Sequence, residues 1–258
     1  REYNWMAFLV SENGVDLARG VLSFKRNSKI GQLGFLEFVE NQQAFHLLMK
    51  SMESEANSHQ LLELRGPTNI NFFISYRWKL PNGGEPFYSE PVVPAYYHDF
   101  IQSEGYFVSE SWDTFEIDFK KSIRQWGEKQ KALDSKRSEN YLKIKLRCIR
   151  PWDFKNEIKI IHKLFVESYK QMGEYDEIDL ESFTLLYKDF KYLINPFFSY
   201  IAYYKNEPVG FVLNIFDPLP ILREFSKRPP TKLERIKLLI KLQLNRSRLL
   251  IMYSGRIP

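Results

Sequence analysis

The stretch GFLEFVENQQAFHLLMKS, residues 34–51, places a short polar segment between an apolar alternating pattern and an amphipathic one. It reads as a strand that runs almost directly into a helix. The first N–H groups of a helix lack main-chain partners, so a strand-to-helix junction is a common binding place for pyrophosphate. Phosphate-binding loops usually contain glycines, which let the backbone approach closely. This junction instead reads Glu40-Asn41-Gln42-Gln43, which leaves a phosphate site without glycines and a plain turn as open interpretations.

Other polar residues near this junction have types that could do chemistry. Glu37 and Glu40 lie near the end of the strand, where one is expected to face a cleft as a base, unless both are solvated carboxylates. Asn69 follows the turn Arg65-Gly66-Pro67 and offers either an amide donor to a carbonyl or a turn cap. The four histidines are scattered and show no ligand spacing with Cys or Asp, so no metal site is predicted.

Composition bounds the classes of function. With 258 residues, 44% of them hydrophobic, the chain can form one large domain or two small ones. No run of about 18 apolar residues is present, so no transmembrane segment is expected. The net charge of +5 suits a polyphosphate ligand or an acidic carrier protein, and no nucleic-acid-binding module is found. The single cysteine, Cys148, is expected in the core and favours a reducing compartment, the cytoplasm.

The elements that position the candidate residues follow from periodicity. Alternation over Trp5–Val10 and Val15–Phe24, with an Asn-Gly turn between them, predicts a hairpin. A third strand is expected over Ile30–Val39 and a helix over Ala44–Ser58. A short strand, a helix that ends at Gly105 and a final strand are expected over Leu61–Leu64, Ala95–Glu104 and Tyr106–Phe119.

A second set of elements is predicted after a charged helical connector. Its first strand places alternate residues from Leu142 to Cys148 on one face, and helices follow Asp153 and span Leu180–Ile194. A second hairpin, Phe198–Phe216, then repeats the first, and a basic helical insertion precedes a last strand at Leu249–Ser254. The predicted organisation is a first module at 1–120, a connector at 121–140 and a second module at 141–258.

The two hairpins share a detail that suggests an internal repeat. Each places a small residue shortly after its turn, Ala18 in the first and Gly210 in the second. We therefore expect Ala18 and Gly210 to occupy equivalent positions in two similar sheets.

Several segments of the chain resemble the GCN5-related N-acetyltransferase (GNAT) superfamily. YLKIKLRCIRPWDFKNEIKIIHKLF and SYIAYYKNEPVGFVLNIF are similar to its opening strand, first helix and second and third strands. IGQLGFLEFVE, LLELRGPTN and PAYYHDFIQSEGYFV resemble its fourth strand, fifth strand and fourth helix. The resemblance implies an α/β fold of the bacterial tandem type. Each of its two GNAT-like modules is a twisted mixed β-sheet flanked by helices, the first without its opening strand and helices and the second cut off after its fourth strand.

In that superfamily the fourth and fifth strands diverge, and the thioester of acyl-CoA lies in the gap. The resemblance implies an N-acyltransferase that uses acetyl-CoA or another acyl-CoA, or an acyl carrier protein, to acylate an amine of a small molecule or peptide. It assigns the base role to Glu37 and the acid role to Tyr97. The implied cofactor-binding residues are Phe38, Val39, Gln42, Gln43, Ala44 and Asn69.

The sequence also departs from the family pattern. Of the phosphate-binding loop only the closing small residue, Ala44, is present, and Ile101 stands where the acid tyrosine is usual, one turn after Tyr97. These departures leave a second hypothesis, a catalytically degenerate protein that serves as a binding or interaction module.

Two further segments allow alternative roles. The aromatic residues between Phe72 and Tyr88 either fasten a long loop to the core or line an acceptor pocket. The basic amphipathic insertion Ile221–Leu244 either packs between domains or docks on an acidic carrier or a membrane surface.

Overall fold

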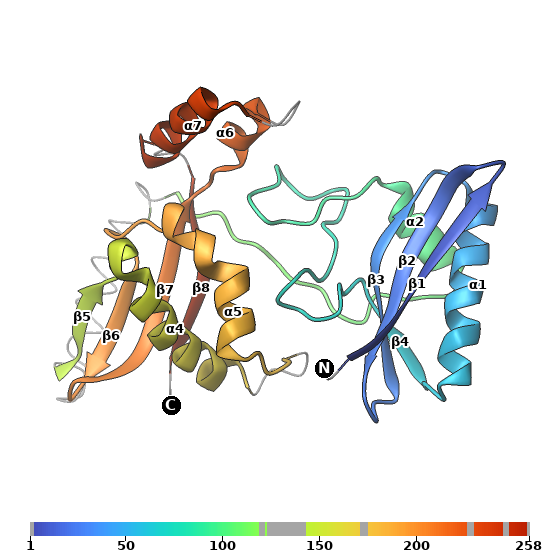
Figure 1. The fold of residues 1–258 in the computed structure, drawn as a ribbon, viewed down its shortest axis with the longest axis horizontal. Coiled ribbons are helices and arrows are strands. Elements are labelled where there is room, and N and C mark those ends of the chain that lie inside the picture. The colour runs from blue at the N-terminus through green and yellow to red at the C-terminus, as the bar shows by residue number, and fades with distance from the viewer. Residues whose placement is uncertain are drawn as a thin grey trace. The chain divides into compact units, whose positions relative to one another are not determined.

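The computed structural model describes residues 3–118, 122, 143–170, 175–225, 230–244 and 248–256 (Figure 1). Its internal contacts divide the chain into two compact units. The first unit comprises Arg1–Val108 with Gly173–Asp176, and the second comprises Ser109–Met172 with Glu177–Pro258. The predicted connector at 121–140 lies, apart from Ser122, outside the described residues, so it stays a prediction.

The first unit opens with the predicted hairpin, which is confirmed. Strands β1 (Tyr3–Glu12) and β2 (Val15–Lys25) pair antiparallel around Asn13 and Gly14. The φ angles of these two turn residues are 52° and 78°, the left-handed backbone that Asn-Gly supplies at low cost. Residues along β1 alternate between the core and the opposite face, as the pleat of a half-buried strand requires.

The rest of the first unit completes a mixed four-stranded sheet in the order β1-β2-β3-β4. Strand β3 (Ile30–Phe38) is antiparallel to β2, and β4 (Glu63–Arg65) is parallel to β3. Helix α1 (Gln42–Ser58) crosses between β3 and β4 and covers one face of the sheet, as Figure 1 shows. Helix α2 (Tyr96–Ser103) adds Tyr97 to the same core. The largest fully buried side chains of this core are Leu22, Leu33, Phe45, Leu48, Met49 and Met52.

The second unit contains a separate four-stranded sheet in the order β5-β6-β7-β8, in which every neighbouring pair is antiparallel. A mixed sheet was predicted for both halves, so that prediction is wrong for this sheet and confirmed for the first. The strands are β5 (Lys145–Cys148), β6 (Tyr200–Tyr204), β7 (Glu207–Phe216) and β8 (Leu249–Arg256).

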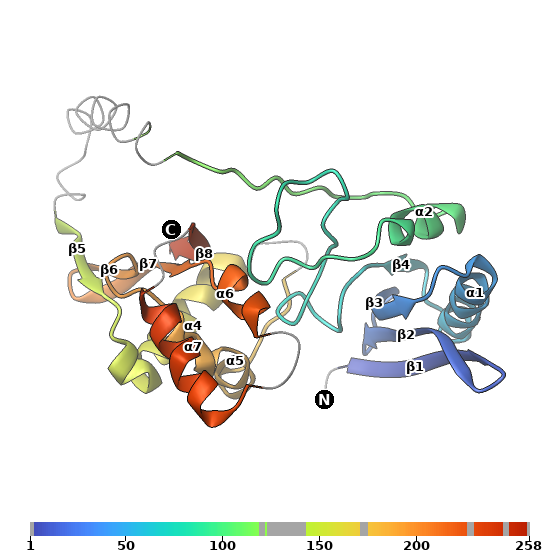
Figure 2. The ribbon, with the colours of Figure 1, turned by 90° about the horizontal axis from the view of Figure 1, so that it is seen from above.

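Helices connect these strands and cover one face of the sheet. A short 3₁₀ turn, η2 (Pro151–Asp153), leads into α4 (Phe154–Tyr169), and α5 (Leu180–Tyr187) continues into η3 (Lys188–Tyr192). Helices α4 and α5 lie side by side in Figures 1 and 2. The side chains of α4 that the 3.6-residue spacing assigns to the core, Ile158, Ile161, Leu164 and Phe165, are all buried.

One buried charge joins the strand and the helix that open the second unit. The Glu157 side chain is fully buried and accepts two hydrogen bonds from the Arg147 guanidinium, at 2.9 and 3.0 Å. Arg150 donates a further bond of 2.9 Å to the same carboxylate, and Arg147 also donates to the Tyr203 hydroxyl. A buried carboxylate requires such partners, since an unpaired one costs several kcal/mol of desolvation. Periodicity gave no signal for this cluster.

Ala18 and Gly210 occupy equivalent positions in the two hairpins. Ala18 pairs with Val10 and Gly210 pairs with Ala202, in each case the last regular pair before a register shift on the turn side. Each residue also lies on a strand whose other edge carries a third strand, β3 or β8. The hairpin repeat predicted from the sequence therefore has a counterpart in strand register.

Two local predictions are wrong. No strand forms over the described residues 106–118, although their side chains alternate in character. Alternation stabilises a strand only where a neighbouring strand pairs with it, and this segment has no such partner among the described residues. Cys148 was expected in the core but is exposed, because β5 lies at the edge of its sheet and most of its side chains face solvent.

Candidate functional site

The candidate site lies where β3 and β4 diverge. The two parallel strands pair only over Ile30–Gln32 and Glu63–Arg65. Beyond these pairs two hydrogen bonds still join the segments: the N–H of Thr68 donates to the Leu33 carbonyl at 2.8 Å, and the N–H of Phe35 donates to Asn69 Oδ1 at 2.6 Å. Asn69, predicted either to donate to a ligand carbonyl or to cap a turn, bridges the two segments through its Oδ1 atom. Past Phe35, the described residues place no parallel strand beside β3.

A β-bulge in β3 lies where the segment after β4 makes its last close contact with the strand. Arg19 pairs with Glu37 and Val21 pairs with Gly34, so β3 holds one residue more than β2 over this interval. Phe35 adopts φ = 48°, a left-handed conformation that is uncommon for a bulky residue. A Cβ atom on Gly34 would come within 2.2 Å of the Thr68 carbonyl oxygen, so only glycine permits this close approach of the two segments.

Two tyrosines of α2 occupy the edge of β3 beyond the bulge. The N–H of Phe38 donates to the Tyr97 hydroxyl at 2.9 Å, and the Tyr96 hydroxyl donates to the Phe38 carbonyl at 2.8 Å. The Phe38 and Tyr97 rings stack with their centroids 3.7 Å apart. Two of the predicted site residues, Phe38 and Tyr97, are thus in direct contact.

The hydroxyl of Tyr97 has a specific hydrogen-bonding role. It accepts from Phe38, so its own proton is still available for donation, and the described residues provide no recorded acceptor for it. Burial, together with Tyr97 and Glu40, raises the pKa of Tyr96. Tyr96 therefore stays protonated at neutral pH, and its proton is already engaged by the Phe38 carbonyl.

The start of α1 is formed by a capped junction. Asn41 Oδ1 accepts from the N–H of Ala44 at 3.0 Å, and the Asn41 carbonyl accepts from Phe45. Among the described residues no hydrogen bond reaches the main-chain N–H groups of Gln42 and Gln43. Of the three predicted phosphate-binding positions, Ala44 is therefore used by the cap and the two glutamines keep outward N–H groups.

Side chains around this junction are turned toward α2. Gln42 Nε2 lies 3.4 Å from Ser103 Oγ, at the last residue of α2. One turn further along α1, the His46 ring lies 2.9 Å from the Glu104 carboxylate. The pair of His46 and Glu104 was not predicted, because the two residues belong to different helices and no sequence pattern links them.

Glu37 lies on the opposite face of the sheet from Tyr97. Consecutive residues of a strand point to opposite faces, and Phe38 points to the core. The Glu37 carboxylate is 64% exposed and accepts two hydrogen bonds from Arg19, at 2.6 and 3.0 Å. The two predicted catalytic residues are thus separated by the sheet.

Val39, the remaining predicted cofactor contact, is exposed. Its N–H group donates to the Leu17 carbonyl and so continues the pairing of β3 with β2.

The long loop before α2 is fastened to the core by one of its aromatic residues. The Trp78 ring packs edge-on against Tyr97, with the centroids 5.3 Å apart. Within the loop, Asn71 Oδ1 accepts from the N–H groups of Phe73 and Ile74, so Asn71 caps a turn. Part of the aromatic loop therefore supports the tyrosines of α2.

Neither a metal-binding cluster nor a membrane-spanning helix is present among the described residues. No group of three or more His, Cys, Asp and Glu side chains in the described ranges is arranged to hold a metal ion. In the same part of the chain, no helix combines the length and the apolar character needed to cross a bilayer.

The chain was compared with known proteins. No protein-family model matches it. It is 21% identical over 227 residues to Protein YghO of Escherichia coli (strain K12), an alignment that covers 82% of this chain and 55% of that protein. The chain thus spans about half the length of this curated relative.

Proposed function

We propose that the chain is a GNAT-like acyltransferase that moves an acyl group from CoA to an amine. The observation that carries the proposal is that the parallel pairing of β3 and β4 ends after three residue pairs and that, among the described residues, no hydrogen bond joins the two segments past Phe35 and Asn69. Only three residues separate β3 from α1. In the GNAT superfamily, which this chain resembles, the fourth and fifth strands diverge in this way around the thioester. The order β1-β2-β3-α1-β4-α2 supports the proposal, and the strand expected after α2 at Tyr106–Phe119 is missing over the described residues 106–118.

The proposed reaction is direct attack of an amine on the thioester. The C–N bond forms at the carbonyl carbon, the C–S bond breaks, and the CoA thiolate leaves. A base takes the proton of the attacking amine, and an acid protonates the thiolate. Tyr97 is suited to the acid role because its hydroxyl proton is available. Glu37, exposed on the other face of the sheet, is suited to deprotonate an acceptor that approaches from that side.

The acyl-CoA would bind along the unpaired half of β3, with its pyrophosphate at the start of α1. The N–H groups of Gln42 and Gln43 are oriented for an anion there. Glu40 opposes this binding, because a second negative charge a few ångströms away costs about 1 kcal/mol in water. Gln42 has its side chain turned toward Ser103, which keeps it away from the helix axis.

A second function, a degenerate binding module on the same fold, is favoured by one specific observation. Both main-chain groups of Phe38 are occupied by tyrosine hydroxyls, and a pantetheine arm would have to displace them. The Glu37 carboxylate is likewise engaged by Arg19. A protein with these contacts fixed would keep the fold and lose the transfer reaction.

Calorimetry with acetyl-CoA tests the donor site. The 258-residue chain is expected to bind in the high-micromolar range or more weakly, roughly −5 kcal/mol. The double variant Glu40→Ala, Gln42→Gly removes the repulsive charge and supplies the glycine that phosphate-binding loops usually contain, and should bind at least about fivefold more tightly.

Glu85→Ala is the matched control, because it removes an exposed carboxylate from a loop outside the site and changes the net charge equally. Equal tightening in Glu85→Ala would assign the effect to overall charge. Tight binding by the unmodified chain would contradict the weak site argued here. Absence of binding by both the unmodified chain and the double variant would favour the degenerate module.

A further inference from the structure

Helices α6 (Leu219–Glu224) and α7 (Lys232–Leu244) form an insertion between β7 and β8 of the second unit. In Figure 1 they lie together beyond the ends of these strands. Lys241 of α7 forms an ion pair with Glu224 of α6. Leu238 and Leu242, one turn apart, are the half-buried apolar residues of α7. The side of α7 that carries Leu238 and Leu242 is thus partly buried.

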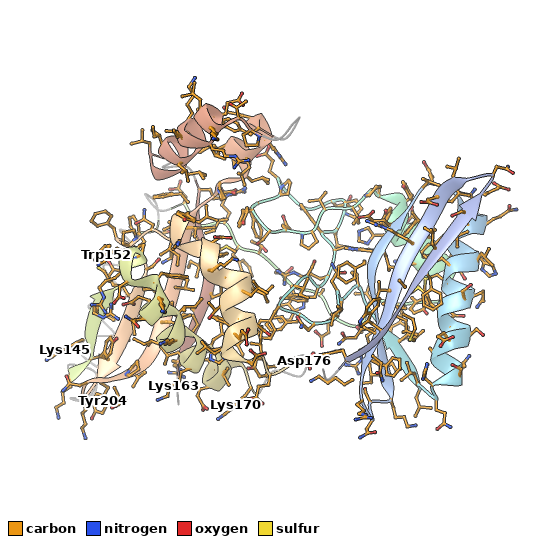
Figure 3. All side chains as sticks on the ribbon, in the orientation of Figure 1. Lys145, Trp152, Lys163, Lys170, Asp176 and Tyr204 are labelled. Carbon is orange, nitrogen blue, oxygen red and sulfur yellow. The ribbon has the colours of Figure 1, made fainter. Side chains whose placement is uncertain are left out.

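The other side of α7 carries an exposed apolar stripe. Leu233, Ile236, Ile240 and Leu244 follow one another at spacings of three, four and four residues, which places them along one side of a helix. These four residues are 54–71% exposed. The stripe is about 17 Å long at 1.5 Å per residue. The side chains of the insertion stand out around both helices in Figure 3. Large apolar side chains aligned in this way are costly to keep in water.

Basic residues border the stripe. At about 100° per residue, Lys232 and Lys237 lie on the two flanks of the stripe, and Arg235 lies nearer the opposite side; all three are exposed. With Lys241, α7 has four basic residues against one acidic residue, Glu234. Lysine and arginine can place their aliphatic stems along an apolar surface while the charged groups reach outward.

We propose that α7 lies on an anionic lipid surface, with its apolar stripe in the interface and its basic residues at the headgroups. An apolar line flanked by Lys and Arg is the pattern of a helix that lies in the plane of a membrane. A helix of 13 residues is about 20 Å long, too short to span the roughly 30 Å hydrocarbon core. Charge complementarity favours anionic lipid over a second copy of this chain, since two basic helices repel each other.

Vesicle co-sedimentation tests the proposal with the whole 258-residue chain. The chain should bind vesicles of equimolar phosphatidylcholine and phosphatidylglycerol, and bind pure phosphatidylcholine vesicles at least about fivefold more weakly. Ile236→Ser with Ile240→Ser should weaken anionic binding at least about tenfold, because two apolar side chains leave the interface. Isoleucine and serine have similar helix propensities, so the helix itself is retained.

Matched controls come from other helices of the second unit. Leu185→Ser with Leu186→Ser removes two exposed leucines from α5 and should leave binding unchanged. Lys237→Glu should weaken binding by about fivefold or more, while Lys159→Glu on α4 should have a smaller effect. Circular dichroism checks that each variant keeps its helix content.

Three results would overturn the proposal. The first is no binding to the anionic vesicles, which would point to an acidic protein as the partner of α7. The second is binding that the change at Ile236 and Ile240 leaves unaltered. The third is a dimer in sedimentation analysis that this change dissociates, because the stripe would then be covered by a second copy. The vesicle assay uses neither acyl-CoA nor an acceptor, so it is independent of the proposed function.

Discussion

Tyr97 and Phe38 come from distant parts of the sequence, and their contact gives each residue a role that neither has alone. The stacked rings fill the space beside the bulge, and the hydrogen bond satisfies a buried N–H group. Sequence reasoning identified Tyr97 as a candidate acid through the family resemblance. It had no means of identifying the partner, because the register of α2 against β3 depends on packing.

Removal of the Tyr97 hydroxyl should therefore affect stability. Tyr97→Phe leaves the Phe38 N–H buried without a partner, so the free energy of unfolding should fall by about 1–3 kcal/mol in urea titration. Tyr96→Phe is the control, since Tyr96 is only half-buried and a carbonyl retains a second lone pair. Equal losses in the two variants would argue against a special role for the Phe38 N–H.

Glu37 supports a prediction about catalysis. Glu37→Gln should lower kcat more than it lowers stability, because a base acts on the transition state. Its ion pair with Arg19 is exposed, so its loss should cost about 0–1 kcal/mol. Arg19→Gln breaks the same pair and keeps the carboxylate, so it should retain turnover. If Arg19→Gln reduces turnover as much as Glu37→Gln does, the pair acts by positioning and the base lies elsewhere.

At the scale of the elements, local sequence patterns predicted the structure correctly where they specified a turn or the buried face of a helix. The Asn-Gly turn and the alternation around it predicted the first hairpin, and helical spacing predicted the buried face of α4. The same alternation failed over residues 106–118, because a strand also needs a partner. The bulge at Phe35 had no local signal, since it arises from the approach of the chain near Gly34.

Substitutions of Asn41 can separate the role of the α1 N-terminus in stability from its proposed role in binding pyrophosphate. Asn41→Ala removes the cap on Ala44 and should destabilise the protein by about 0.5–2 kcal/mol in thermal or urea unfolding. Asn41→Asp keeps an accepting oxygen and adds a negative charge that favours the helix N-terminus. Stability should therefore be retained in Asn41→Asp, while affinity for acetyl-CoA falls. Unchanged affinity in this variant would place the pyrophosphate away from α1.

At the scale of the whole molecule, two cores support two sheets. The first core surrounds Phe45 and the second surrounds Leu164, and both side chains are fully buried. The sequence predicted two modules because its element pattern repeats, and it predicted their boundary between Phe119 and Tyr141 from a charged segment with helical period. The division by contacts falls at Val108 and Ser109, with Gly173–Asp176 assigned to the first unit. The assignment of so short a segment to the other unit cannot be predicted from amino-acid composition.

Because each unit has its own core, a substitution in one core should destabilise that unit and leave the other unit's stability unchanged. Phe45→Ala should destabilise the first unit by about 3–5 kcal/mol, and Leu164→Ala should destabilise the second by about 2–5 kcal/mol. Hydrogen exchange followed by mass spectrometry should show loss of protection confined to the unit that carries each change. Loss of protection in both units after either change would mean that they unfold together.

Cys148 is exposed, so its thiol can react with reagents in solution while the chain stays folded. The chain has no other cysteine, and this one lies at the end of an edge strand in the second unit. A maleimide dye would therefore label the folded chain at one defined site, without denaturation and without engineered thiols. Air oxidation would act at the same sulfur and join two chains covalently, so a preparation made without reductant would contain a species of twice the chain's mass.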